Sequence, residues 1–319
     1  MKPGALKDKG TVIAMFVALV TFIVSASYIF ENQLEIEGTA RLILTICRGA
    51  FPIIGFIVLK KRILTPTKRK WIFFALLLLA GVILPVAPNP VDSLQQVFNM
   101  FISERSHGLP GVIGALIVCL LANKIACGWA CQLGALQDLI FRLNRNKKDN
   151  KGIFKQYKVP FKVSNTIRIV FTSVVVFAAM ILAIDAYTPV DPMFVFDPTS
   201  LGILGLAVAL FVLGASLFIY RPWCYFFCPF GLLGWFSEKY SMHKIYIDRD
   251  VCTSCQVCAK ACPSNTMDAI LNQKKTIPDC FICGSCISAC PKKAVHFDRS
   301  KKTLRIKLDK DRNKDECAR

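Results

Sequence analysis

Histidine and acidic side chains are scarce in this chain of 319 residues, which holds 3 His and 21 Asp+Glu against 40 Lys+Arg. So few His argue against membrane haems, whose iron commonly takes His as an axial ligand. The sequence also lacks a Cys-x2-Cys-His run, which excludes a covalently attached c-type haem. No Gly-x-Gly-x-x-Gly run opens a helix after a strand, so the dinucleotide-binding fingerprint is absent as well. We therefore expect no haem.

Apolar residues, in contrast, are abundant, at 54% of the chain. They gather in blocks of about 20 residues, the length needed to cross the hydrocarbon core of a bilayer. This pattern excludes an ordinary soluble enzyme and predicts an α-helical integral membrane protein with about six spans. The predicted spans are residues 11–30, 42–59, 71–87, 109–126, 163–184 and 201–220.

The net charge of +19 is distributed between these blocks rather than along one face. Lys and Arg crowd the segments before 11, between 59 and 71, and between 126 and 163, whereas the other connections hold mostly acids. Because Lys and Arg stay on the cytoplasmic side during insertion, we expect a multi-pass protein of the inner membrane with both termini cytoplasmic. The charge then reflects orientation, so lipid is an expected partner and nucleic acid is not. The alternative for residues 1–30 is a cleaved signal peptide with small residues at 25–27.

An internal repeat is suggested by two segments that share an order of features. The first segment contains, in order, Pro90-Val91-Asp92, an apolar block and Cys127-x3-Cys131. The second contains, in the same order, Pro189-Val190-Asp191, an apolar block and Cys224-x3-Cys228. Both halves start on the same side, so this is a parallel repeat about an axis along the membrane normal. Such an axis would bring all four thiols together at the cytoplasmic side.

The clearest chemistry lies in residues 244–298, where Cys252-x2-Cys255-x2-Cys258-x3-Cys262-Pro is repeated as Cys280-x2-Cys283-x2-Cys286-x3-Cys290-Pro. This is the bacterial two-cluster ferredoxin run, in which the fourth Cys binds the other cluster. It predicts a small α+β domain with two [4Fe–4S] clusters, since zinc sites prefer paired Cys-x2-Cys and the cytoplasm disfavours disulfides. The predicted ligands are Cys252, Cys255, Cys258 and Cys290 for cluster one, and Cys280, Cys283, Cys286 and Cys262 for cluster two.

The four motif cysteines, Cys127, Cys131, Cys224 and Cys228, allow several interpretations. Residues four apart on a helix share a face, so each pair can present two thiolates to one ligand. Four thiolates can hold an additional iron–sulfur cluster, bind copper or zinc, or cycle between dithiol and disulfide. Alternatively, Cys acts here only as a small apolar residue.

The chain thus divides into a two-span segment (1–70), a repeat domain (71–240), the ferredoxin domain (244–298) and a charged tail (299–319). Two polar residues near the spans are candidate catalytic groups. Arg48 lies inside the second predicted span, where a charge faces either a quinone site or a buried acid. His107, on the outer side, is a candidate proton acceptor for quinol oxidation. His243 and His296 flank the ferredoxin domain and are expected at the surface.

The two Cys-x3-Cys motifs, the second within Arg221-Pro222-Trp223-Cys224, followed by a two-cluster ferredoxin, resemble the NapH/NosR/CcoG family over residues 71–298. The NapH-like branch implies a quinol dehydrogenase subunit that exchanges electrons with an iron–sulfur partner of a reductase complex. The chain has no room for the outer flavin-binding domain of NosR-type regulators or the extra domain of CcoG-type proteins. It departs from the pattern at Gln132, where Pro is usual, and in its six rather than four predicted spans.

The leading hypothesis is therefore a membrane-bound electron-transfer subunit between the quinone pool, or a membrane partner, and a redox protein. Menaquinol or another quinone is the expected small-molecule partner. A second hypothesis is a factor that delivers electrons or metal during maturation or regulation of a metalloenzyme. A third is a structural anchor whose clusters only stabilise the fold.

Overall fold

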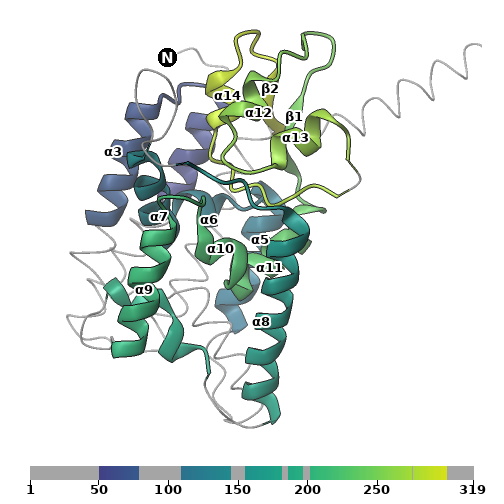
Figure 1. Cartoon of the computed structure of the whole chain (residues 1–319). Helices are drawn as coiled ribbons and strands as arrows, with labels where there is room; N and C mark the ends of the chain where they lie inside the picture. Colours follow the sequence, from purple (N-terminus) through teal and green to yellow (C-terminus); the bar gives the residue numbers. More distant parts are fainter. Residues whose placement is uncertain are drawn as a thin grey trace, which may run out of the picture.

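The structure is a computed structural model, which describes residues 50–78, 109–144, 155–181, 186–196, 202–274 and 276–299. Four of the predictions made above lie outside the described residues: the span 11–30, the Pro90-Val91-Asp92 element of the repeat, the candidate groups Arg48 and His107, and the tail after 299. The described chain forms a group of helices with a small α+β part at one end (Figure 1).

The helices of the two halves follow one another in the same order. The first half contains Ala50–Lys60, α3 (Pro66–Leu77), α5 (Leu109–Ala122), α6 (Ile125–Trp129) and α7 (Gln132–Leu143). The second contains α8 (Phe161–Ile181), η3 (Thr188–Val190), η4 (Pro192–Phe196), α9 (Ile203–Ala215), α10 (Pro222–Phe226) and α11 (Pro229–Glu238). In both halves an apolar helix leads to a five-residue helix and then to a helix capped by the second motif Cys.

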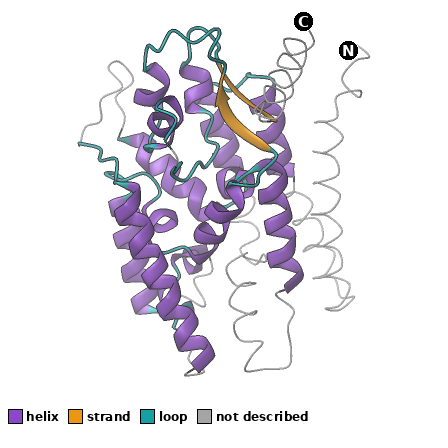
Figure 2. Cartoon of the chain, turned by 90° about the vertical axis from the view of Figure 1, so that its right-hand side faces the viewer, coloured by secondary structure: helices purple, strands orange, loops and turns teal. Residues whose placement is uncertain are grey.

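The C-terminal part is the expected ferredoxin-type unit. It contains β1 (His243–Ile247), α12 (Val257–Ala261), α13 (Thr266–Leu271), α14 (Ser285–Ala289) and β2 (Val295–Arg299). The strands pair antiparallel, with His243 opposite Arg299 and Ile247 opposite Val295. Figure 2 shows this two-stranded sheet at one end of the helices. Alternate residues of β1 face inward, so Ile245 and Ile247 join the core that also holds Leu59 and Trp129 of the helical part.

The apolar helices differ from the six predicted spans. Among the described residues one helix, α8, is long and apolar enough to cross a membrane. Val112–Ala122 and Ile203–Ala215 are shorter apolar helices within the predicted spans 109–126 and 201–220. The prediction that 109–126 is one continuous helix is wrong, because the chain breaks at Asn123, whose φ is +58°, and buries the charged Lys124 directly after it. A helix of 13 residues extends only about 20 Å, less than the roughly 30 Å hydrocarbon core.

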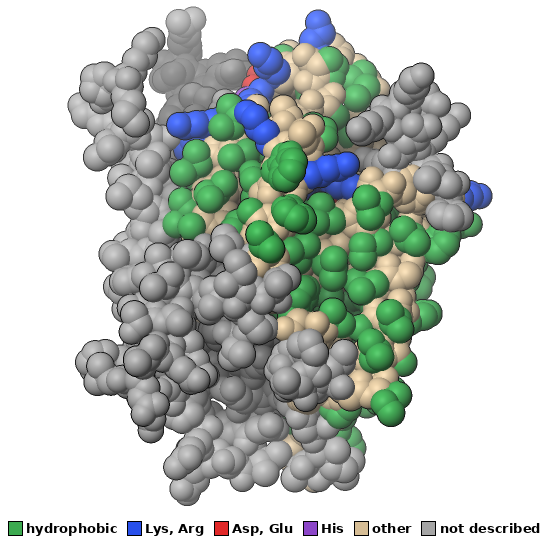
Figure 3. Space-filling model, turned by 90° about the vertical axis from the view of Figure 1, so that its left-hand side faces the viewer, with side chains coloured by type: hydrophobic (Ala, Val, Ile, Leu, Met, Phe, Trp, Pro, Cys, Tyr) green, Lys and Arg blue, Asp and Glu red, His purple; other side chains and the backbone are tan. Residues whose placement is uncertain are grey.

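Helix α8 has its apolar residues on the outside. A stripe of exposed side chains follows the helical spacing: Val163, Ile167, Val170, Val174, Phe177 and Ile181. The opposite face buries the polar Ser164 and the charged Arg168. A soluble helix shows the reverse pattern, with its apolar stripe turned toward the core. Figure 3 shows a further face with many exposed hydrophobic side chains, on which Lys and Arg gather toward the ferredoxin end.

The ferredoxin part joins the helices through a buried charged network. Lys124 pairs with Asp279, whose Oδ2 also forms an ion pair with Arg168 Nη2 at 2.9 Å. Asp138 on α7 accepts from Arg69 of α3 at 2.7 Å and from Arg142 at 2.6 Å, and Tyr220 donates to it. The Arg69 guanidinium in turn donates to the carbonyl of Cys283. These contacts bring together residues up to 214 positions apart, which fixes the ferredoxin part on the helices.

The expectation that His243 lies at the surface is wrong. Its side chain is buried, packs edge-on against Phe56 and has its Nδ1 2.8 Å from the carbonyl of Leu121. Strand β1 carries it inward because it is the first of three alternate residues on the buried face. His296 is only half-buried and stacks on Tyr246 across the sheet.

We predict that Lys124→Met destabilises the protein by about 3–5 kcal/mol, because it removes the cation next to both Asp279 and Glu238 and leaves these two carboxylates with Arg168 alone. Thermal unfolding of the full chain in detergent micelles measures the change. The control is Lys274→Met, which removes an ion pair with Asp268 whose side chains are 57% and 50% exposed. Equal melting temperatures for the two variants would contradict the prediction.

Candidate iron–sulfur centres

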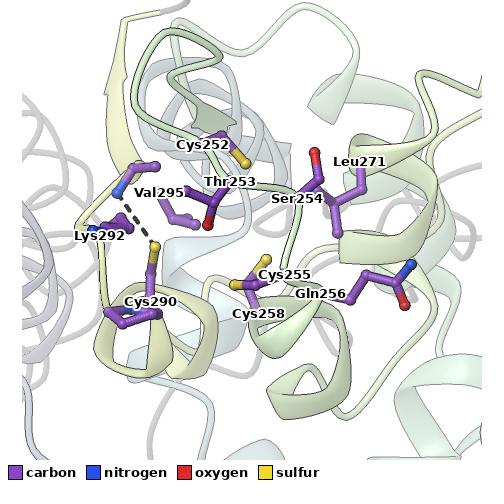
Figure 4. A pocket seen from close by; sticks show the side chains of 12 residues that line it. Cys252, Thr253, Ser254, Cys255, Gln256, Cys258, Leu271, Cys290, Lys292 and Val295 are labelled. Atoms are coloured by element: carbon purple, nitrogen blue, oxygen red, sulfur yellow. Dashed lines mark hydrogen bonds between the residues drawn. The ribbon is translucent and has the colours of Figure 1, made fainter.

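The structure brings the four predicted ligands of cluster one around a single cavity. Cys252, Cys255, Cys258 and Cys290 line it, together with Leu271 and Val295 (Figure 4). The first three come from the loop before α12 and its first turn, and Cys290 follows α14. Cys290 Sγ accepts a hydrogen bond from the Ala294 backbone amide at 3.3 Å. Cys255 is exposed, so this cavity lies at the surface of the protein.

A second cavity collects the predicted ligands of cluster two. Its cysteines are Cys262, Cys280, Cys283 and Cys286, and its walls include Tyr220 and Phe281. Cys286 and Cys262 are buried, and the cavity lies nearer the helices than the first. The fourth Cys of each run thus reaches the cavity of the other run, as the ferredoxin pattern requires. Thiolate sulfur is the donor that iron–sulfur clusters take, so both cavities fit such a group.

Left-handed backbone positions turn the three clustered thiols inward. Ser254 and Gln256 have φ of 53° and 58° in the first run, and Ile282 and Gly284 have φ of 45° and 74° at the same places in the second. Non-glycine residues rarely adopt this conformation, least of all a β-branched one such as Ile282. Strain of this kind persists where the surroundings enforce it, typically at functional sites. Each short helix then ends at its fourth Cys, which is extended and followed by Pro.

The four motif cysteines form a third group, between the two halves. Cys131 and Cys228 are the N-caps of α7 and α11, and their sulfurs accept from the amides of Gly134 at 3.4 Å and Gly231 at 3.3 Å. Cys127 and Cys224 are the third residues of α6 and α10. Cys127, Cys131 and Cys228 pack against one apolar cluster, and Cys127 and Cys224 pack in another, so the two pairs lie close to each other. Helix N-termini favour negatively charged sulfur at Cys131 and Cys228.

Two buried guanidinium groups surround these thiols. Arg221 donates to the carbonyls of Cys127 at 2.7 Å and Gly128 at 3.2 Å, and Arg168 donates to the carbonyl of Cys224 at 3.2 Å. Burial raises the pKa of Cys224 to about 12, with a further contribution from Cys131, whereas Arg221, Lys124 and Arg168 act to lower it. A metal centre at this site would therefore have to replace thiol protons, which the neighbouring cations favour.

The third group and the second cavity share a wall. Gly128, next to Cys127, lies so close to Phe281 that an added Cβ would be 2.3 Å from the Phe281 carbonyl oxygen. The indole Nε1 of Trp129 donates to the carbonyl of Ile282 at 3.0 Å. Phe281 also packs with Cys224 and Cys127 in one apolar cluster. The order of cysteine sites from the helices outward is therefore the motif thiols, the second cavity and the first cavity.

The sequence did not single out the charged residues of this region. Lys124 and Arg168 are charged residues within predicted spans, and this is the same pattern that makes Arg48 a candidate. Asp138 and Asp279, in contrast, look like ordinary loop or surface acids. Burial alone would raise the pKa of Asp138, but Arg142, Arg69 and Arg221 hold it well below its usual range. Asp138 is thus an anion whose charge is shared among three guanidinium groups.

Comparison with known proteins agrees with this arrangement of cysteines. Residues 244–310 match the 4Fe-4S dicluster domain, and residues 107–151 and 201–244 match a 4Fe-4S binding domain. The matching relatives include two ferredoxin-type proteins named NapH and two regulatory proteins named NosR. The chain belongs to the NapH/NosR-type 4Fe–4S ferredoxin family. No solved structure matches the chain.

Individual members of this family match only part of the chain. The ferredoxin-type protein NapH of Haemophilus influenzae is 29% identical over 204 residues, which cover 58% of this chain and 67% of NapH. The uncharacterized protein MJ0749 of Methanocaldococcus jannaschii is 30% identical, covering 57% and 68%. YccM of Escherichia coli, whose name describes electron transport, is 27% identical, and the match spans 56% of this chain and 52% of YccM.

We predict that Gly284→Ala removes the iron of the second cavity. The residue has φ of +74°, and an added Cβ would lie 2.4 Å from Leu64 Cδ2 and 2.5 Å from Leu59 Cδ2. Iron analysis should show a loss of about four Fe per chain, one cubane. Gly214→Ala in α9 is the matched control, because no atom lies within 4 Å of its added Cβ. Full iron content in Gly284→Ala would show that this backbone position is not required.

Proposed function

We propose that this chain is a membrane-bound subunit that transfers electrons between the quinone pool, or a membrane partner, and a redox protein. The observation that carries the proposal is the unbroken series of cysteine sites from the helices to the surface. The motif thiols adjoin the second cavity through Gly128 and Phe281, and the first cavity opens at the exposed Cys255. Family membership supports iron–sulfur electron transfer as the general activity.

In this proposal, Cys252, Cys255, Cys258 and Cys290 hold cluster one, and Cys262, Cys280, Cys283 and Cys286 hold cluster two. Each cluster, when bound, accepts and releases one electron at a time. The protein holds the ligands of both clusters in fixed positions. The left-handed residues Ser254, Gln256, Ile282 and Gly284 direct the thiols inward, and the buried pair of Lys124 and Asp279 holds the second loop on the helices.

We assign a third iron–sulfur centre to Cys127, Cys131, Cys224 and Cys228. Support comes from the parallel repeat, because both halves present one Cys within a short helix and one at an N-cap. The 4Fe-4S binding domain matches the two segments that carry these pairs. Four buried cations and the partly buried Arg142 lie around this region, against the carboxylates of Asp138, Asp279 and Glu238, which suits a centre with negative charge.

We also propose that the helices span the inner membrane several times, with the termini and the ferredoxin part in the cytoplasm. The exposed apolar stripe of α8, with Ser164 and Arg168 turned inward, supports contact with lipid. Lys and Arg gather at the ferredoxin end, as expected for a cytoplasmic face (Figure 3).

The proposed partners meet opposite ends of this series. Quinol would bind on the membrane side, where Arg48 and His107 remain candidates. A redox protein would dock over Cys255, the exposed edge of the first cavity, where Lys260, Lys292 and Lys293 are also exposed. Positive side chains at such a rim favour encounter with an acidic partner.

The alternative is a maturation or regulatory factor, which the relatives named regulatory protein NosR favour. A deletion strain separates the two functions. Under the alternative the target metalloenzyme lacks metal. Under the leading proposal it is fully metallated but receives no electrons. If the clusters only anchor the fold, Cys127→Ser or Cys224→Ser retains electron transfer.

We predict that a menaquinol analogue reduces the clusters of the purified full chain in nanodiscs, or that a quinone oxidises the reduced clusters. One quinol releases two electrons and two protons, enough to reduce two one-electron centres. Bleaching of the visible iron–sulfur absorbance follows the reaction. Clusters inert to quinol and to quinone, yet reducible by dithionite, would exclude the quinone pool as a partner.

We predict about twelve Fe and twelve sulfide per chain, three cubanes in total. Cys224→Ser should lower the content to about eight Fe, whereas Ser216→Ala on the same connection leaves it unchanged. Eight Fe in the unaltered protein would show that the motif thiols hold no iron–sulfur cluster.

A further inference from the structure

The two pairs of motif thiols have the same cationic surroundings. In the first half, Arg221 Nη1 bonds the carbonyl of Cys127 and lies 3.1 Å from the Cβ position of Gly134. In the second half, Arg168 Nη1 bonds the carbonyl of Cys224 and lies 3.3 Å from the Cβ position of Gly231. Each guanidinium thus lies between two backbone groups of its thiol pair. One is the carbonyl of the first Cys, and the other belongs to the glycine whose amide donates to the sulfur of the second Cys.

These two arginines do not occupy equivalent positions in the repeat. At the offset of 97 residues that relates the Cys pairs, Arg221 corresponds to Lys124, which binds Asp279 and not a Cys carbonyl. At the offset of 99 residues that relates the two Pro-Val-Asp elements, Arg168 corresponds to Arg69, which binds Asp138 and the carbonyl of Cys283. Duplication of a half therefore does not by itself account for the match. The position next to the first Cys carbonyl is occupied by a guanidinium group in both pairs, but the two arginines come from different parts of the chain.

The cations beside the motif thiols outnumber the carboxylates they pair with. The side chains of Arg168 and Arg221 are fully buried. Arg221 lies 3.6 Å from Asp138, which also pairs with Arg69 and Arg142, so three guanidinium groups share one carboxylate. Arg168 and Lys124 share Asp279, and Lys124 also lies 3.8 Å from the carboxylate of Glu238. Buried charges ordinarily require full compensation. A negatively charged thiolate centre would supply the missing charge.

Unused donors lie next to the same thiols. The Nε–H groups of Arg168 and Arg221 are buried without a hydrogen-bond partner among the described residues. The side-chain amide of Gln132, which follows Cys131, is also buried and has no partner for its Nε2. Buried donors without partners are rare and usually indicate a group that the protein binds. Sulfur in a metal–thiolate centre accepts such hydrogen bonds, and they tune its potential.

We infer that Arg168 and Arg221 are positioning residues that hold a negatively charged centre on Cys127, Cys131, Cys224 and Cys228 and raise its reduction potential. This rests on the third centre assigned under the proposed function. A nearby positive charge stabilises the reduced state, which carries one more negative charge, more than the oxidised state. Loss of either arginine charge therefore lowers the potential of this centre.

The test is an EPR-monitored redox titration of the full chain in nanodiscs. Arg168→Gln and Arg221→Gln should each lower the midpoint of the third centre by at least a tenfold change in its reduction equilibrium, which is 59 mV for one electron. Arg168→Lys and Arg221→Lys keep the charge and should restore the midpoint. Lys274→Gln removes one charge at the surface and should leave it unchanged. The signal of cluster one, on the far side of the ferredoxin part, reports that each variant is folded.

The outcomes separate this inference from the proposed function. An unchanged midpoint in both Gln variants, with the third signal present, overturns the role of the arginines and leaves the third centre in place. Loss of the third signal in a Gln variant but not in its Lys counterpart supports the requirement for charge. Loss in both variants of one arginine, with cluster one intact, contradicts it. Absence of a third signal and of iron beyond two cubanes in the unaltered protein overturns the third centre itself.

Discussion

Five cations, four of them buried, share three carboxylates where the ferredoxin part meets the helices, and the positions of the motif thiols and the second cavity depend on this network. Asp138 pairs with Arg69, Arg142 and Arg221, Asp279 pairs with Lys124 and Arg168, and Glu238 lies 3.8 Å from Lys124. Through these contacts helix α3 reaches the carbonyl of Cys283, and Arg221 reaches that of Cys127. Buried ion pairs contribute little net stability compared with apolar packing, but removal of one partner is strongly destabilising. Such a network therefore specifies one arrangement of the two parts more than it strengthens either.

The same network surrounds chemistry that apolar packing alone could not support. A small ferredoxin unit has too little core to be stable by itself, and its clusters take the place of core. Here the helical part adds to that core, because Leu59, Leu64, Phe73 and Trp129 pack in one cluster with the buried residues of β1 and β2. The buried charges and the apolar packing around them thus have different effects. The charges fix how the ferredoxin part sits on the helices, and the apolar packing supplies most of the stability of the fold.

The sequence predicted the cysteine sites better than the helices. The spacing of Cys252 to Cys290 was sufficient to predict which thiols share a cavity, because short loops leave few alternatives. The repeat predicts that Cys127, Cys131, Cys224 and Cys228 share one centre, and this stays a prediction. The break at Asn123 was missed because Lys124 is stabilised there by Asp279, 155 residues away. The burial of His243 was missed for a related reason, since its partner is the carbonyl of Leu121 in helix α5, 122 residues away. Contacts of this range leave no local pattern in a single sequence.

The contact between Gly128 and Phe281 has a consequence for how fast electrons can move. Without a side chain at Gly128, two main chains touch, one beside Cys127 and the other beside Cys280 and Cys283. Tunnelling rates fall steeply with the gap between centres, and a gap bridged by side chains varies as those side chains change rotamer. At this contact the gap is a non-bonded contact between two backbone segments, and the hydrogen bond from Trp129 to the Ile282 carbonyl holds them together. Under the proposed electron transfer, the distance between the helical thiols and the second cavity therefore does not depend on side-chain rotamers.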